Sequence, residues 1–67
     1  MEKYIRVLNA IDDNWKVCNA NVPADTDHIQ EVEKWCEKYC HGEWVNVYSK
    51  FYLKEDKDVT FFILRWA

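Results

Sequence analysis

The sequence predicts a single α+β domain, in which one amphipathic helix packs on a small, mostly antiparallel sheet of three or four strands. Residues 27–41 repeat apolar side chains at helical spacing, whereas residues 43–54 alternate them at strand spacing. Four Trp, four Tyr and three Phe among 67 residues supply one core, since each aromatic side chain buries roughly 150–250 Å². We therefore expect residues 1–67 to form one domain.

The first third of the chain is expected to contribute two strands. Residues 3–9, KYIRVLN, resemble a strand, and residues 10–15 resemble a turn. Residues 15–22, WKVCNANV, indicate a weaker strand because Asn19 and Asn21 disfavour it. The alternative for this segment is a short helix with one apolar face, formed by Ile11, Trp15, Cys18 and Val22.

The clearest element is a helix from Asp27 to His41. Its apolar arc consists of Ile29, Val32, Trp35, Cys36, Tyr39 and Cys40, and its polar side consists of Glu31, Lys34, Glu37 and Lys38. Asp27 is the expected N-cap, with Asp25 or Thr26 as alternatives. Gly42, the only glycine, is expected to end the helix in a left-handed conformation.

Trp35 lies in the middle of the apolar arc, so we expect it to anchor the helix on the sheet. Its truncation to alanine is expected to cost about 3–5 kcal/mol.

Residues 43–54, EWVNVYSKFYLK, are expected to form one unusually long strand. One face would hold Val45, Val47, Phe51 and Leu53, and the other Trp44, Asn46, Tyr48 and Lys50. A charged turn, residues 55–58, follows. Residues 59–66, VTFFILRW, are expected to form a strand that pairs back on the previous one. The alternative is a helix with one apolar face, formed by Val59, Phe62, Ile63 and Trp66.

Charge and hydropathy exclude several classes of function. The net charge is −3 and no basic run exceeds one residue, whereas a nucleic-acid-binding protein normally presents a positive patch. The longest apolar run, FFIL, is too short to cross a bilayer, and the first ten residues do not resemble a signal peptide. Three cysteines cannot all pair within one chain. We therefore expect a cytoplasmic protein that binds neither nucleic acid directly nor membranes.

The densest cluster of chemically reactive residues is WCEKYCHGEW, residues 35–44. Cys36 and Cys40 are four residues apart and share one helix face, but His41 diverges from both by helical geometry. A zinc site needs four converging ligands. The favoured interpretation is that both cysteines are buried apolar side chains and that the protein holds no cofactor. The alternative is a small zinc-binding domain, with ligands drawn from Cys18, His28, Cys36, Cys40 and His41.

Catalysis is not expected. The cysteines are spaced C-x₃-C near a helix C-terminus, where the helix dipole would raise rather than lower a thiol pKa. The carboxylate pairs are expected in turns or on a solvated helix side, and they are Asp12/Asp13, Glu33/Glu37 and Asp56/Asp58. Nothing in the sequence indicates the burial that tunes a catalytic carboxylate.

The remaining candidate is a protein-binding surface. Trp44, Tyr48 and Tyr52 are expected to face away from the helix, beside the acidic residues Glu33 and Glu37. An exposed aromatic patch of this kind is typical of protein–protein interfaces. The alternative is a second, partial core, formed if the N-terminal segment folds over that sheet face.

The last residues, Phe62-Ile63-Leu64-Arg65-Trp66, follow an aromatic strand and an acidic turn. This ending resembles those of small bacteriophage-encoded accessory proteins. The resemblance covers less than a third of the chain, and it implies a host bacterial cytoplasm and binding to a host protein. The function expected is that of an inhibitor or modulator of a host defence or nucleic-acid-processing factor, with a structural or assembly role as an alternative.

Self-association is also expected. A sheet covered by one helix leaves two edges open. The terminal strand, ending in Arg65 and Trp66, would pair with its symmetry mate and bury Trp66 in a homodimer. The alternative is a monomer whose open surface binds a different partner.

Overall fold

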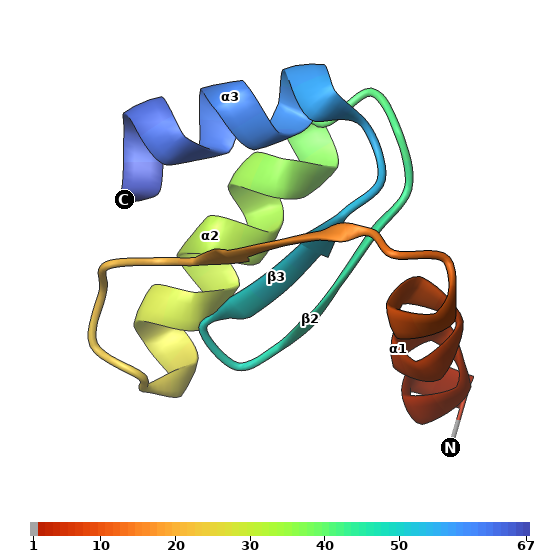
Figure 1. Ribbon diagram of the computed structural model, residues 1–67. Coiled ribbons are helices and arrows are strands. Elements are labelled where there is room, and N and C mark those ends of the chain that lie inside the picture. Colours follow the sequence, from red (N-terminus) through yellow and green to blue (C-terminus); the bar gives the residue numbers. More distant parts are fainter. Residues whose placement is uncertain (1) are drawn as a thin grey trace.

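The computed structural model describes residues 2–67 and shows an α+β fold, in which three helices cover a three-stranded antiparallel sheet of order β1-β3-β2 (Figure 1). The elements in chain order are α1 (Glu2–Asp12), β1 (Lys16–Asn19), α2 (Thr26–Tyr39), β2 (Trp44–Val47), β3 (Lys50–Leu53) and α3 (Asp56–Trp66). The α+β class and the antiparallel sheet are confirmed. The strand expected within residues 15–22 is β1, and the short-helix alternative there is wrong.

The expectation of a strand at residues 3–9 is wrong, because this segment lies within α1. Val7 and Ala10 are the buried residues of α1. They are three positions apart, so a helix brings both to one face, whereas a strand would place them on opposite faces. Asn14, with φ of 59°, reverses the chain after α1 and leads it into β1.

The strand expected at residues 59–66 is also wrong, and the helical alternative holds. Asp58, Phe62 and Trp66 are four residues apart and all buried in α3. Asp56 and Asp58 lie in the first turn and Arg65 in the last, which is the favourable order for the helix dipole. Because Trp66 packs inside the molecule on a helix, no terminal strand exists for the homodimer expected from the sequence.

The long strand expected at residues 43–54 is a hairpin, in which Tyr48 and Ser49 form the turn. Tyr48 adopts a φ of 52°, in the left-handed region that two-residue hairpin turns use. The register pairs Trp44 with Leu53 and Val45 with Tyr52. Odd-numbered residues of β2 therefore share a face with even-numbered residues of β3, so the expected division of the two faces is wrong.

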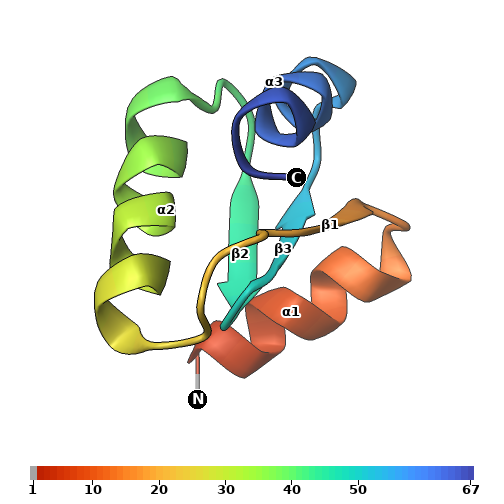
Figure 2. The same cartoon turned by 90° about the vertical axis from the view of Figure 1, so that its left-hand side faces the viewer.

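Helices α1 and α2 lie on opposite sides of the strands (Figure 2), and each sheet face carries its own core. On the face covered by α2 and α3, the core consists of Cys18, Ala20, Val32, Cys36, Phe51, Leu53, Phe62 and Trp66. On the face covered by α1, it consists of Val7, Ala10, Val45 and Tyr52. The N-terminal segment thus folds over the second face, as the alternative interpretation required, although it does so as a helix.

Helix α2 begins one residue before the expected Asp27 and ends two residues before His41. Its N-cap is Asp25, whose carboxylate accepts a hydrogen bond from the N–H of His28 at 2.9 Å. Cys40 ends the helix in an extended conformation, and Gly42 has no positive φ, so the expected left-handed stop is wrong. Gly42 instead allows a close approach, since a Cβ there would collide with the side chain of Glu55.

Trp35 packs mainly between the two helices of its layer. Its ring meets those of Phe62 and Trp66 edge-to-face, with centroids 6.2 Å away in each case. Its side chain is only partly buried. Trp35 therefore joins α2 to α3, whereas Val32 and Cys36 make the contact of α2 with the sheet core.

Candidate functional site: a groove along the open edge of β2

β2 lies at one edge of the sheet, and within residues 2–67 no strand pairs with its outer side. The carbonyl of Glu43 accepts a hydrogen bond from the N–H of Lys54 at 3.1 Å, which fixes the alternation of the antiparallel ladder. Val45 and Val47 consequently direct their backbone groups towards β3. Trp44 and Asn46 direct theirs towards the open edge.

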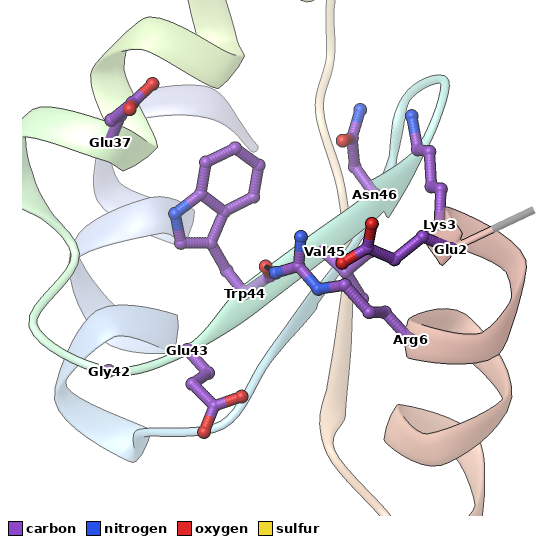
Figure 3. A pocket seen from close by; sticks show the side chains of 9 residues that line it. All are labelled: Glu2, Lys3, Arg6, Glu37, Gly42, Glu43, Trp44, Val45 and Asn46. Atoms are coloured by element: carbon purple, nitrogen blue, oxygen red, sulfur yellow. Dashed lines mark hydrogen bonds between the residues drawn. The ribbon is translucent and has the colours of Figure 1, made fainter.

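This open edge forms the floor of a groove between α1 and α2, which consists of two adjoining cavities of about 680 and 490 Å³. The first is lined by Glu2, Lys3, Arg6, Glu37, Gly42, Glu43, Trp44, Val45 and Asn46 (Figure 3). The second is lined by Lys3, Tyr4, Val7, Ala24, Asp25, Thr26, Ile29, Gln30, Glu33, Asn46, Val47 and Tyr48. Lys3 and Asn46 belong to both cavities, so the groove is continuous along β2.

Arg6 reaches from α1 to the open edge (Figure 3). Its guanidinium donates a hydrogen bond to the carbonyl of Trp44 at 2.8 Å. A charged side chain on an edge strand is a common protection against uncontrolled strand pairing. In this structure Arg6 satisfies one outward carbonyl of β2 and occupies the position that a further strand would take.

Asn46 fixes the other end of the groove floor. Its side chain is buried, and its amide donates to the carboxylate of Glu33 at 2.8 Å and to the carbonyl of Tyr48 at 3.0 Å. These two bonds tie β2 to α2 and to the hairpin turn. The groove is therefore preformed by the fold.

The groove is predominantly acidic. Its carboxylates are Glu2, Asp25, Glu33, Glu37 and Glu43, and its cationic side chains are Lys3 and Arg6. The groove therefore carries a net negative charge along β2. Positive groups on a ligand would be attracted there and neutral or acidic ones would not.

The structure brings together four of the five residues predicted to bind a partner. Glu37 and Trp44 line one cavity of the groove, and Glu33 and Tyr48 line the other. Tyr48 is 72% exposed at the hairpin turn.

Tyr52 is the exception, because it is buried under α1 on the opposite sheet face. Trp44 is half-buried, and its ring stacks on that of Phe51 with 6.1 Å between the ring centroids. The expectation of an outward aromatic patch formed by Trp44, Tyr48 and Tyr52 is therefore wrong. The hairpin register separates Tyr52 from the other two residues.

Cys18 and Cys36 are buried in the core and Cys40 is partly buried beside it, and all three are poorly suited to nucleophilic chemistry. Burial raises the pKa of the Cys36 thiol, and neighbouring Cys40 raises it further. Burial also raises the pKa of Cys40 and of Cys18. Thiolates are the reactive and metal-binding form, so these thiols are held in the inert form at neutral pH.

The histidines considered as zinc ligands point to other partners. His28 pairs with Asp25, with 2.8 Å between Nδ1 and the carboxylate, and His41 lies 3.5 Å from Asp58. Within residues 2–67 no three His, Cys, Asp or Glu side chains are grouped so that they would hold a metal ion.

Asp58 is the one carboxylate of the chain's described part that is fully buried, at 1% exposure. It accepts hydrogen bonds from the backbone N–H of His41 at 3.0 Å and of Gly42 at 2.8 Å. Burial raises its pKa, but these hydrogen bonds together outweigh burial and the net pKa is lowered. Through these hydrogen bonds, Asp58 attaches the loop after α2 to the start of α3. Its neighbour Asp56 is exposed, so the two do not form an acid–base pair.

The α1 wall of the groove could not be found from the sequence analysis, because a strand at residues 3–9 would place Arg6 on the opposite face from Lys3 and Val7. A helix places all three residues on one side. The spacing of Tyr4, Leu8 and Ile11 fits a helix, but these side chains are exposed in α1, and the buried face of the helix is formed by Val7 and Ala10. Also missed was an exposed apolar patch on α2 and α3, where a cavity of about 510 Å³ is lined by Trp35, Tyr39, His41, Phe61, Leu64 and Arg65.

Comparisons of the chain with protein-family models, with curated proteins and with solved structures found no match. Across residues 2–67, none of the helices combines the length and the apolar character that spanning a bilayer requires.

Proposed function

We propose that this protein is a non-enzymatic binding module that engages a protein partner through the β2 groove. The observation that carries the proposal is the acidic groove between α1 and α2, whose rim carries the exposed side chains of Glu37, Glu43 and Tyr48. The acidic residues along the groove would speed association with a basic partner.

The partner proposed is a host protein, and the binding module acts as its inhibitor or modulator. Support for a host context comes from the phage-like ending at residues 62–66, and support for binding comes from the groove. Glu33 and Glu37, predicted from the sequence as partner-binding residues, have different roles in this proposal. Glu37 is exposed and meets the partner, whereas Glu33 holds Asn46 in place.

Site-directed photo-crosslinking tests this function. A photoreactive benzoyl-phenylalanine replaces Tyr48 at the rim of the groove, and in a control it replaces Thr60, which is exposed on α3. In bacterial lysate, we expect a defined protein to crosslink through position 48 and not through position 60. Charge reversal by Glu37→Lys together with Glu43→Lys should abolish the product. Equal crosslinking at both positions, or none at position 48, would contradict the proposal.

A further inference from the structure

We propose that a second surface of this protein, the cavity between α2 and α3, binds an amphipathic helix of a protein partner, in which acidic side chains flank an apolar stripe. This cavity shares no lining residue with the β2 groove, so the two sites would bind different ligands. Three features of the cavity point to this helix: its exposed apolar side chains, the charge at its rim and the spacing of its residues.

The apolar side chains around the cavity are accessible to a partner. Leu64 is 78% exposed, Phe61 54% and Tyr39 50%. Trp35 is partly buried and packs against the core beneath them. The cavity is thus an extension of the core that reaches the surface, and a ligand that covered it would remove large apolar side chains from water.

The fixed charge at this cavity is positive. Arg65 and His41 line it, and among residues 2–67 no carboxylate does. The ammonium nitrogen of Lys38 lies 5.2 Å from the centroid of the Tyr39 ring, and the guanidinium carbon of Arg65 lies 3.9 Å from that of Trp66. These cation–π contacts hold both charges beside apolar side chains. Although the whole protein has a net charge of −3, this rim favours an acidic ligand over a basic one.

The spacing of the lining residues suits a helix as the ligand. On α2, Trp35 and Tyr39 are four residues apart, and on α3, Phe61 and Leu64 are three residues apart. Each pair therefore forms a ridge along its helix, and a helix packs between such ridges with apolar residues at every third or fourth position. Because α3 has 11 residues, it is about 16 Å long, which about three turns of a ligand helix would span.

Two other occupants fit this cavity less well. Binding to anionic lipid takes a cluster of several basic residues, whereas Arg65 is the only permanently charged side chain among the lining residues. A second copy that docked through the same surface would bring Lys38 and Arg65 of both copies into one interface, which is unfavourable. A separate acidic helix meets neither obstacle.

The probe is a capped, fluorescently labelled peptide of about 15 residues, long enough to be partly helical alone. Leucine occupies every third or fourth position, and glutamate flanks this stripe. One control peptide replaces every glutamate with glutamine. The other keeps the composition but shuffles the order, so that leucine no longer falls on one helix face. We expect the first peptide to bind and to gain helical circular dichroism, the glutamine peptide to bind several-fold more weakly, and the shuffled peptide at least tenfold more weakly. Equal binding of either control, or binding without a gain in helix, would overturn the inference.

Substitutions on α3 locate the site. Leu64→Asp places a carboxylate at the most exposed side chain of the cavity, and Ile63→Asp is the matched control, since Ile63 is 51% exposed and does not line the cavity. Both variants add the same charge to the same helix turn. Only Leu64→Asp should weaken the glutamate peptide at least tenfold, and equal weakening by both would overturn the inference. Replacing Lys38 and Arg65 together by glutamine should remove the preference for glutamate over glutamine, and a preference that survived would contradict the role of the rim.

The competing occupants are tested on the same variants. Sedimentation at high micromolar concentration should show a monomer, and anionic phosphatidylserine vesicles should not retain the protein. A dimer that Leu64→Asp disperses, or vesicle binding that Leu64→Asp abolishes, would show that a second copy or a lipid surface covers the cavity and would overturn the inference. Each of these results leaves the β2 groove unaffected, because its lining residues are different.

Discussion

The substitution Asp58→Asn tests how the loop after α2 is held, and hence how the Trp44 end of the groove is positioned. The carboxylate of Asp58 accepts the N–H groups of His41 and Gly42 while almost fully buried. Hydrogen bonds to a charged group contribute about 1.5–3 kcal/mol each. Asparagine keeps the shape and one acceptor oxygen, but turns an NH₂ group towards a backbone donor. We expect the free energy of unfolding to fall by about 3 kcal/mol.

A loss of this size is large for a domain of 67 residues, whose total stability should be of the order of 3–10 kcal/mol. The assay is urea unfolding at pH 7, followed by tryptophan fluorescence and by far-ultraviolet circular dichroism. The matched control is Asp56→Asn, which removes the same charge from the same helix turn but at an exposed position. If the free energy of unfolding of Asp58→Asn lies within about 0.5 kcal/mol of that of the control, the error of such comparisons, the hydrogen bonds to Asp58 contribute nothing and the reasoning fails.

The same carboxylate predicts a pH dependence. The pKa of Asp58 is lowered in the folded state, so its stabilising effect is fully present above the ordinary value of 3.8 and is lost as the pH falls through the folded value. Wild-type protein should therefore lose stability in acid below about pH 4. Asp58→Asn should lose less over that range, and parallel acid profiles for the two proteins would refute the assignment.

Three further predictions concern the contacts of α2 and of the loop that follows it. Trp35→Ala should destabilise by about 3 kcal/mol, the lower end of the usual range because the ring is partly exposed, and a urea midpoint near that of wild type would show that its contacts between α2 and α3 are unimportant. The hydrogen bond to Asp25 raises the pKa of His28, and the backbone hydrogen bond from His28 lowers the pKa of Asp25. The stabilising effect of the Asp25–His28 pair should therefore be lost as the pH rises through the pKa of His28 in the folded protein. It should also be lost as the pH falls through the pKa of Asp25 in the folded protein. His28→Gln should abolish only the loss on the alkaline side, as measured by urea midpoints across pH, and an unchanged alkaline profile would contradict the pairing. Gly42→Ala should cost about 1 kcal/mol, and Glu55→Ala in the same chain should restore most of it, whereas additive effects would show that the two residues do not collide.

Helix α2 could be predicted because its apolar residues repeat at helical spacing on one face and polar residues occupy the other. Ile29, Val32 and Cys36 are buried at helical spacing, and an acidic cap precedes them. The alternation in residues 43–54 likewise predicted strand structure. It could not reveal the hairpin turn, because Tyr48-Ser49 is not one of the Asn-Gly, Asp-Gly or Gly-X pairs that mark two-residue hairpin turns, and Tyr48 is not a residue from which a left-handed φ is expected.

Helices α1 and α3 were predicted as strands because short apolar segments fit both periods. What decides between them is tertiary: Val7 and Ala10 must cover one sheet face, and Phe62 and Trp66 must cover the other. The assumption of a single helix also hid the groove, since one of its walls is α1. Glu33, Glu37, Trp44 and Tyr48 could be singled out from sequence, whereas Lys3 and Arg6 needed the fold.

The most direct test of the central claim is a map of amide chemical-shift changes, recorded as a short lysine-rich peptide is added to ¹⁵N-labelled protein. The account predicts that the largest changes follow the groove, at Arg6, Glu37, Trp44, Asn46 and Tyr48. The apolar patch at Phe61 and Leu64 should change little. Changes centred on that patch, with Trp44 and Asn46 unaffected, would contradict the assignment of the β2 groove as the binding site.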